Sequence, residues 1–103
     1  MNHIYNITFV CGVHDAPFVL DFLREELLHH ICIDGAFSPR LARVRSSEND
    51  AVSFALELHL PDLGTLKNWR EKTLLPVLEN VSRKWGERLV NFHTVLEPIN
   101  LSL

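Results

Sequence analysis

Residues 52–60 read VSFALELHL, and this stretch decides the fold. Large apolar side chains alternate there with small or polar ones; the apolar set is Val52, Phe54, Leu56, Leu58 and Leu60. The residues between them are Ser53, Ala55, Glu57 and His59. Strict alternation over this length is typical of a β-strand that buries one of its two faces. We therefore predict a half-buried strand here.

The hydrophobic period switches between 2 and 3.6 on both sides of this strand. Period-2 stretches cover residues 3–11, 41–45, 52–60 and 88–97, and helical stretches cover 16–31 and 63–85. Strand, helix, strand, strand, helix, strand is the split βαβ order of a ferredoxin-like α+β sandwich with two layers. We expect an antiparallel sheet of order 4-1-3-2, both helices on one face, and a hairpin loop at 46–50.

Both predicted helices carry boundary signals. Asp15 is the expected N-cap of the first helix, and Pro17 is compatible with its first turn. Gly86 is the expected C-cap of the second helix. Pro76 lies inside the second helix, where it removes a backbone hydrogen bond and forces a kink or a break. The apolar stripe agrees, because its azimuth shifts by roughly 70–80° across Pro76.

The composition bounds the class of protein. The chain has 103 residues, of which 47% are hydrophobic and 22% charged. These values indicate one folded domain over residues 1–103, with an irregular tail at 98–103. The net charge is −3 and the basic residues are scattered, so nucleic acid is not an expected partner. Because we find neither a membrane-length apolar run nor a secretion signal, we expect a cytoplasmic protein without a membrane partner.

Two helices on one face leave the other face of the sheet open. We expect this open face to carry Ile4, Asn6, Thr8 and Val10, then Arg43 and Arg45, then Ser53, Ala55, Glu57 and His59, and finally Leu89, Asn91, His93 and Val95. Its apolar members, Ile4, Val10, Ala55, Leu89 and Val95, would lie exposed together in a monomer. A contiguous exposed apolar patch usually marks a partner surface. We therefore predict a homodimer that forms through the open faces of two sheets.

Three segments of the chain, at its start, in a middle turn and near its end, form a recognisable set. They read IYNIT (4–8), GAFS (35–38) and WGERLVNFHTVLE (85–97). Together they resemble a small uncharacterised bacterial family of domains of unknown function, over nearly the whole chain. The resemblance implies a ferredoxin-like domain of the dimeric α/β-barrel type. It implies no assigned reaction and no catalytic residue.

Polar residues of the predicted open face are candidates for a ligand pocket. The set is Asn6, Thr8, Glu57, His59, Asn91 and His93. Histidine titrates near neutral pH, and a carboxylate two residues away on the same strand face can orient or charge it. The alternative is that these groups are solvated, or hydrogen-bonded across the dimer interface. The predicted function is a homodimeric, non-catalytic or small-molecule-binding domain, with a pocket at the interface between the two sheets of the dimer and without a cofactor.

The rival prediction is catalytic. Dimeric α/β barrels include cofactor-independent oxygenases and haem-degrading enzymes that use Asn, His and Trp, and this chain has those residue types. Such an enzyme would act on a small hydrophobic substrate through His59 or His93. The same fold also binds RNA, but that needs stacking aromatic residues on the open face of the central strands. We predict no such surface here.

A metal site is not predicted either. The first helix places carboxylates and imidazoles at i, i+4, in the pairs Glu25/His29 and Glu26/His30. The two pairs lie about 100° apart around the helix, so four ligands cannot converge on one ion.

Overall fold

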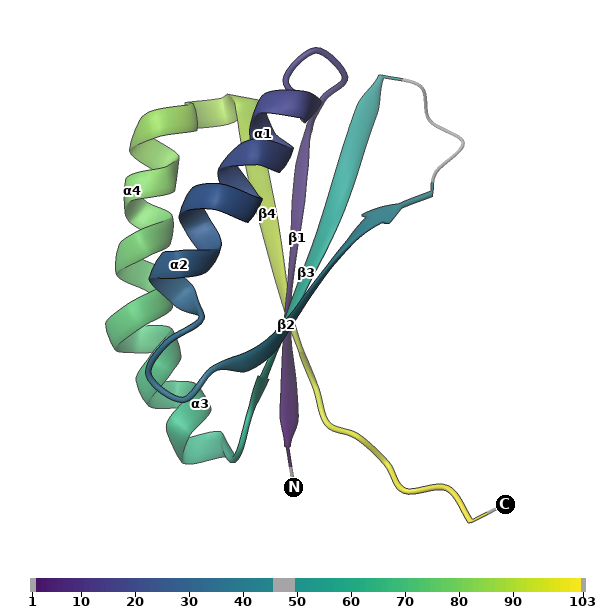
Figure 1. Ribbon diagram of the computed structural model, residues 1–103, viewed down its shortest axis with the longest axis vertical. Coiled ribbons are helices and arrows are strands. Elements are labelled where there is room, and N and C mark those ends of the chain that lie inside the picture. Colours follow the sequence, from purple (N-terminus) through teal and green to yellow (C-terminus); the bar gives the residue numbers. More distant parts are fainter. Residues whose placement is uncertain (1, 46–49, 103) are drawn as a thin grey trace.

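The computed structural model describes residues 2–45 and 50–102. Its strands are β1 (His3–Gly12), β2 (Phe37–Val44), β3 (Ala51–Leu60) and β4 (Leu89–Leu96). The first helix consists of α1 (Ala16–Phe22), a π-helical turn (Leu23–Leu27) and α2 (Leu28–Ile31). The second consists of α3 (Leu63–Trp69), a π-helical turn (Arg70–Leu74), α4 (Leu75–Trp85) and a 3-10 turn (Gly86–Arg88). Figure 1 shows these elements along the chain.

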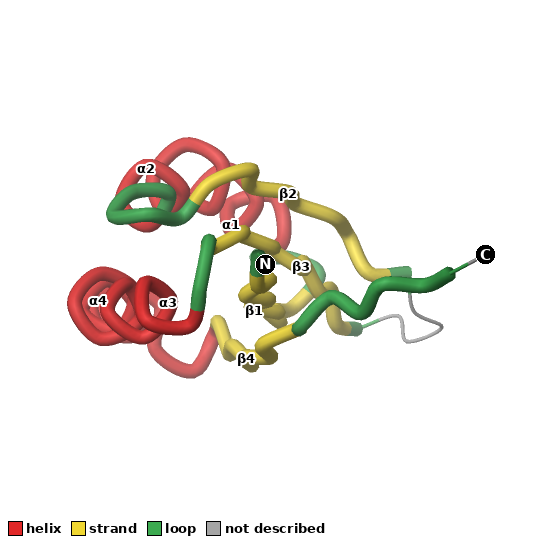
Figure 2. Tube along the Cα trace, turned by 90° about the horizontal axis from the view of Figure 1, so that it is seen from below, coloured by secondary structure: helices red, strands yellow, loops and turns green. Residues whose placement is uncertain are grey.

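The strands form one antiparallel sheet in the order β2-β3-β1-β4. This is the predicted order 4-1-3-2 counted from the other edge. Both helices lie against one face of the sheet (Figure 2). The predicted α+β, ferredoxin-like fold is therefore confirmed. In the described part of the chain, the helices are too short or too polar to cross a membrane.

The apolar face of β3 is buried, as its alternation predicted. Its five large apolar side chains are at most 5% exposed, and the residues between them are half-buried on the open face. The register pairs Leu56 with Ile7 and Phe54 with Phe9 on β1, so both strands point their large side chains toward the helices. Burial of one such side chain contributes about 1.5–3 kcal/mol. This shared layer is therefore the main source of stability.

The predicted interruption at Pro76 takes the form of a wide turn. The Leu75 amide donates to the carbonyl oxygen of Arg70, five residues earlier, directly before Pro76. Pro76 then lies in the first turn of α4, where a missing N–H is tolerated. One extra residue in a turn rotates the following residues by about 100°, which is close to the shift of the apolar stripe. The helix thus continues past Pro76 without breaking.

The first helix has a π-helical turn without a proline. There the Leu28 amide donates to the carbonyl oxygen of Leu23. Phe22 is buried against Trp85, with ring centroids 5.7 Å apart, whereas Phe18 is 66% exposed. The first helix therefore buries one of these two phenylalanines at the edge of the core and leaves the other in solvent.

Both predicted caps lie at the predicted positions, but only Gly86 has the conformation expected of its cap. Gly86 ends α4 with a φ of 57°, a conformation that favours glycine. The side chain of Asp15 makes no capping hydrogen bond to α1. Its carboxylate instead pairs with the Arg88 guanidinium at 2.9 Å, which joins the start of α1 to the chain segment before β4.

Strand β2 is longer than the predicted 41–45. It begins at Phe37, after a turn in which Asp34 and Gly35 both have positive φ. A β-bulge falls between Phe37 and Arg40, and it interrupts the alternation on which the shorter prediction rested. Arg45 lies beyond the end of the strand. Positions 46–49 of the predicted hairpin loop lie outside the described residues.

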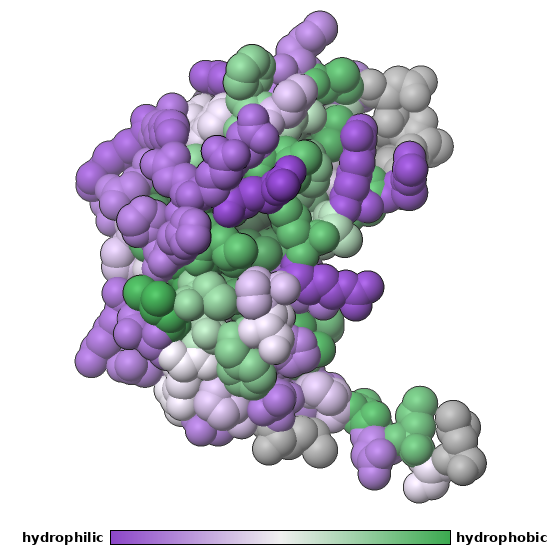
Figure 3. Space-filling view, in the orientation of Figure 1, coloured by the Kyte–Doolittle hydropathy of each residue, from purple (hydrophilic) through white to green (hydrophobic). Residues whose placement is uncertain are grey.

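Two surface features lie beside this framework. Apolar residues reach the surface between the helices and β2, whereas polar residues cover the outer side of the helices (Figure 3). A groove of about 700 Å³ lies there, with Leu20, Leu41 and Phe54 in its walls. Residues 97–102 form neither helix nor strand, and they extend away from the helices on the open-face side of the sheet (Figures 1 and 2).

Candidate functional site

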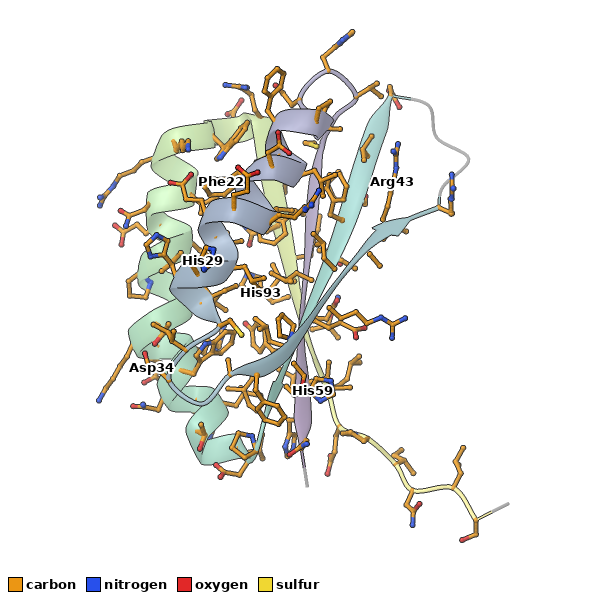
Figure 4. All side chains as sticks on the ribbon, in the orientation of Figure 1. Phe22, His29, Asp34, Arg43, His59 and His93 are labelled. Atoms are coloured by element: carbon orange, nitrogen blue, oxygen red, sulfur yellow. The ribbon has the colours of Figure 1, made fainter. Side chains whose placement is uncertain are left out.

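The sheet separates the six predicted site residues into two groups. Asn6, Thr8, Glu57 and His59 lie half-buried on the open face, as predicted. Asn91 and His93 do not, because β4 pairs them with Phe9 and Ile7, whose side chains face the helices. Figure 4 shows His93 on the helix side of the sheet and His59 on the other side. The prediction of one converging set on the open face is therefore wrong.

The same register corrects the rest of the predicted β4 surface. Leu89 is buried opposite Cys11, and Val95 lies opposite Tyr5 on the helix side. The β4 side chains on the open face are Val90, Phe92, Thr94 and Leu96. The sequence-based prediction places the more apolar side of β4 toward the core. The polar side turns inward instead, because Asn91 and His93 find hydrogen-bond partners at the edge of the helix layer.

Strand β2 needs one correction as well. Arg43 pairs with Phe54 and lines the groove beside α1, so it lies on the helix side of the sheet. Arg40 takes the open-face position instead, opposite Glu57.

Three of the four polar residues that remain on the open face contact near neighbours. The Asn6 amide nitrogen donates to the Thr8 hydroxyl at 3.2 Å. The His59 ring lies against Phe37 of β2, with centroids 5.8 Å apart. On a single sheet these side chains form a surface, and only a second molecule could enclose them.

A hydrogen-bonded chain links β1, β4 and the second helix on the opposite side of the sheet. The Tyr5 hydroxyl lies 2.6 Å from His93 Nδ1, and His93 Nε2 lies 2.7 Å from Asn91 Oδ1. Arg70 Nε donates to the Tyr5 hydroxyl oxygen at 3.1 Å. These side chains come from three segments that are far apart in the sequence, and the antiparallel pairing of β1 with β4 brings Tyr5 beside His93.

The direction of each bond follows from the donors available. The Asn91 amide oxygen is an acceptor only, so His93 Nε2 carries the hydrogen, and in a neutral imidazole Nδ1 is then an acceptor. The Tyr5 hydroxyl then donates to Nδ1, while its oxygen accepts from the guanidinium of Arg70. In this arrangement each of the three hydrogen bonds joins one donor to one acceptor, with His93 neutral.

The electrostatic environment holds both titratable groups in their neutral forms. Burial lowers the pKa of His93 below its ordinary value of 6.5, and the positive charge of Arg70 lowers it further. Burial also raises the pKa of Tyr5 above 10.0, although the hydrogen bond and the charge of Arg70 partly oppose that rise. A neutral imidazole with an accepting Nδ1 beside a phenol can take up a proton.

Aromatic packing fixes the position of Tyr5. The Tyr5 and Trp69 rings meet edge to face, with centroids 5.2 Å apart. Trp69 is fully buried, and its indole N–H donates to the Ile31 carbonyl oxygen at 2.7 Å. The end of the first helix thereby anchors Trp69, and Trp69 in turn supports the Tyr5 ring.

A groove opens over this chain of hydrogen bonds, between α3 and β4. Its volume is about 430 Å³, within the range of small-molecule sites. The described residues that line it are Tyr5, Leu63, Leu66, Lys67, Arg70, His93, Thr94 and Val95. We call this the α3–β4 groove.

Two members of the site, Tyr5 and Arg70, are absent from the sequence-based prediction. The alternation of its strand places Tyr5 on the core side, and a tyrosine hydroxyl in a core usually has a partner. That signal indicates a polar group on a neighbouring strand. It could identify His93 only if β4 were assigned the correct face.

Solved structures similar to this chain define its class. It resembles an EthD family protein from Bacillus halodurans, at 14% identity over 96% of this chain and 100% of that chain, with a TM-score of 0.69. It also resembles SnoaB, a cofactor-independent oxygenase from Streptomyces nogalater, at 15% identity over 97% and 95% of the two chains, with a TM-score of 0.67. A dimeric ferredoxin-like protein from an uncultured marine organism matches at 8% identity over 98% and 100%, with a TM-score of 0.59. At these identities the likeness shows the fold alone, that of ferredoxin-like α+β proteins.

The family follows from the sequence. Residues 2–99 match the model of a family described as a domain of unknown function (DUF4286), and the chain belongs to this family. This agrees with the resemblance noted from the three sequence segments. No curated protein sequence matches the chain.

Proposed function

We propose that this protein acts as a homodimer, of the dimeric α/β-barrel type, in which the open faces of two sheets pack together. The observation that carries the proposal is the apolar character of β4 on that face. Val90, Phe92 and Leu96 are 46%, 59% and 43% exposed. Such a patch is costly on a monomer, and a standard interface would cover roughly 800 Å² of each copy.

Two further features support self-association. Residues 97–102 project from the open-face side, with Ile99 83% and Leu101 73% exposed, where a second copy could bury them. One solved structure with this fold is described as dimeric. In such a dimer Asn6, Thr8 and Glu57 would lie inside the interface. We propose a second copy, rather than nucleic acid or a membrane, as the partner, and the cytoplasm as the location.

We further propose that each copy binds a small molecule. The predicted site residues on the open face have a role at the dimer interface in this proposal, and the ligand occupies the α3–β4 groove. The groove combines an apolar wall with a fixed set of donors and acceptors, as small-molecule sites usually do. This binding role needs no reaction.

Two measurements test the proposal together. Sedimentation velocity at micromolar concentration should give twice the mass of one chain. Native mass spectrometry of the freshly purified protein should show a dimer that carries co-purifying small molecules. A monomer would contradict the dimer, and a dimer that binds nothing from a cell extract or a metabolite panel would contradict the binding role.

Cofactor-independent oxygenation of a small hydrophobic substrate is the second candidate function. One observation favours it: the neutral His93 accepts from the Tyr5 hydroxyl beside the groove, with Trp69 packed against the phenol ring. His59 lies on the other side of the sheet, so the two histidines do not converge. Oxygen uptake with a small hydroquinone would test this function. His93→Gln should abolish uptake and His59→Gln should retain it, and equal rates in both variants would contradict the function.

A further inference from the structure

The α3–β4 groove has a cationic end. Arg70 and Lys67 line it, and the described lining residues include no carboxylate. His93 contributes no positive charge, because it is neutral in the hydrogen-bonded chain. The local charge is therefore positive, although the chain as a whole carries a net charge of −3.

The Arg70 guanidinium is held in place by a hydrogen bond from only one of its three nitrogens. Its Nε donates to the Tyr5 hydroxyl at 3.1 Å, and Tyr5 is itself fixed by Trp69 and His93. Among the described residues, Arg70 makes neither an ion pair nor another side-chain hydrogen bond. The two terminal nitrogens therefore remain available as a pair of donors. That pair matches the two oxygens of a carboxylate.

The rest of the groove is apolar. Leu63 is 51% exposed and Val95 is 47% exposed, although both lie beside the buried Leu66. A ligand that covered these side chains would remove apolar surface from water, which favours binding. The groove thus offers a charged contact and an apolar contact to the same molecule.

We propose that the α3–β4 groove binds a small carboxylic acid with an apolar body, such as a medium-chain or aryl-substituted acid. The carboxylate would contact the terminal nitrogens of Arg70, with Lys67 nearby, and the apolar body would lie on Leu63 and Val95. This inference rests on the proposed small-molecule-binding function and names the class of ligand for it.

Isothermal titration calorimetry with three matched probes tests the ligand class. Octanoate, octan-1-ol and octylamine are straight-chain compounds of equal carbon number that differ in the charge of the head group. We expect octanoate to bind at least ~tenfold more tightly than octan-1-ol, because a charge-assisted hydrogen bond is among the stronger single contacts. We expect octylamine to bind most weakly. Equal affinities for octanoate and octan-1-ol would overturn the carboxylate assignment.

Two variants locate the contact. Arg70→Gln should weaken octanoate binding by ~tenfold or more and leave octan-1-ol binding nearly unchanged. Arg83→Gln is the matched control, because Arg83 is an exposed helix arginine outside the groove that pairs with Glu79. Equal losses in the two variants would overturn the proposal.

The probes also separate this inference from the proposed function. If octan-1-ol binds as tightly as octanoate, the carboxylate class is wrong while the binding function stands. If none of the three probes binds and the purified protein carries no small molecule, the binding function itself fails.

Discussion

The hydroxyl of Tyr5 lies in the layer between the sheet and the helices, where a polar atom without a partner would cost about 1–3 kcal/mol. It has two partners, Arg70 on one side and His93 on the other. Each bond fixes a side chain at the groove. One buried tyrosine thus determines the orientation of both the guanidinium and the imidazole.

Tyr5→Phe tests this role. The substitution keeps the ring and its contact with Trp69, but it leaves His93 Nδ1 and Arg70 Nε without their partner. We expect the free energy of unfolding to fall by about 1–2 kcal/mol, as measured by urea denaturation. Tyr5 is only 1% exposed, whereas Arg70 is exposed and His93 is half-buried, so water in the groove can replace part of the lost hydrogen bonding. An unchanged denaturation midpoint would show that the hydrogen bonds contribute nothing.

The lowered pKa of His93 predicts a loss of stability in acid. Its value in the folded protein lies below the ordinary 6.5, so as pH falls through 6.5 the unfolded chain binds a proton before the folded chain does. Stability therefore rises with pH in this window and is fully present above pH 6.5. We expect the wild type to lose more stability than His93→Gln between pH 7 and pH 5. If the free energy of unfolding falls equally in both proteins over this pH range, the lowered pKa of His93 is contradicted.

At the scale of single residues, the sequence predicts which side chains are buried better than it predicts which polar side chains form hydrogen bonds with one another. Alternation alone places Ile7 and Phe54 in the core, because size and polarity differ sharply between the two sides of their strands. On β4 both sides mix apolar and polar groups, and Phe92 outweighs Asn91 in any hydropathy count. The choice between the two sides depends on Tyr5 and Arg70, which are distant in sequence, so local pattern could not decide it.

At the scale of elements, local sequence pattern likewise predicts the helix interruptions only in part. The phase shift of the stripe revealed the change at Pro76, but it could not distinguish a kink from a break or a π-helical turn. The first helix makes a similar turn at Leu23–Leu27 with no proline to mark it. Local pattern therefore could not predict this turn.

The substitution Pro76→Ala tests whether Pro76 strains the second helix or whether the π-helical turn before it accommodates the proline ring. In a regular helix interior, removal of proline would stabilise the fold by up to ~3 kcal/mol. Here the π-helical turn before Pro76 already accommodates the ring. We expect Pro76→Ala to destabilise the protein slightly, by ~0.4–1 kcal/mol, because the unfolded chain gains freedom. Thermal unfolding would show whether the stability falls or rises. A higher midpoint temperature would contradict the inference that the π-helical turn accommodates Pro76.

The end of α4 depends on the backbone of Gly86. Its φ of 57° and ψ of −137° lie in a region that L side chains rarely adopt, yet an added Cβ would meet no atom within 4 Å. We therefore expect Gly86→Ala to cost about 1–3 kcal/mol through backbone strain alone.

Gly12→Ala is the control for this substitution. A Cβ at Gly12 also meets nothing within 4 Å, and Gly12 has no positive φ. Its substitution should change the denaturation midpoint little. Similar losses in the two variants would show that backbone conformation is not the cause.

At the scale of the whole molecule, the two faces of the sheet have different roles. One face packs the core and carries the α3–β4 groove at its edge. The other carries the exposed apolar residues of β4 beside half-buried polar groups of β1 and β3. The prediction of an uncovered sheet face was correct, but the correct phase of β4 makes that face more apolar than expected. The case for a second copy becomes stronger for that reason.

A charge at the centre of the open face tests the dimer. Ala55 lies half-buried on β3, between Thr8 of β1 and Ala42 of β2. Ala55→Glu would bury an unpaired carboxylate in the interface, which is strongly unfavourable, whereas in a monomer the same carboxylate stays in water. We expect this variant to sediment as a folded monomer with an unchanged circular dichroism spectrum. Asn80→Glu, on the exposed side of α4, adds the same charge away from the open face and should remain a dimer. If Ala55→Glu also remains a dimer, the two copies associate through another surface.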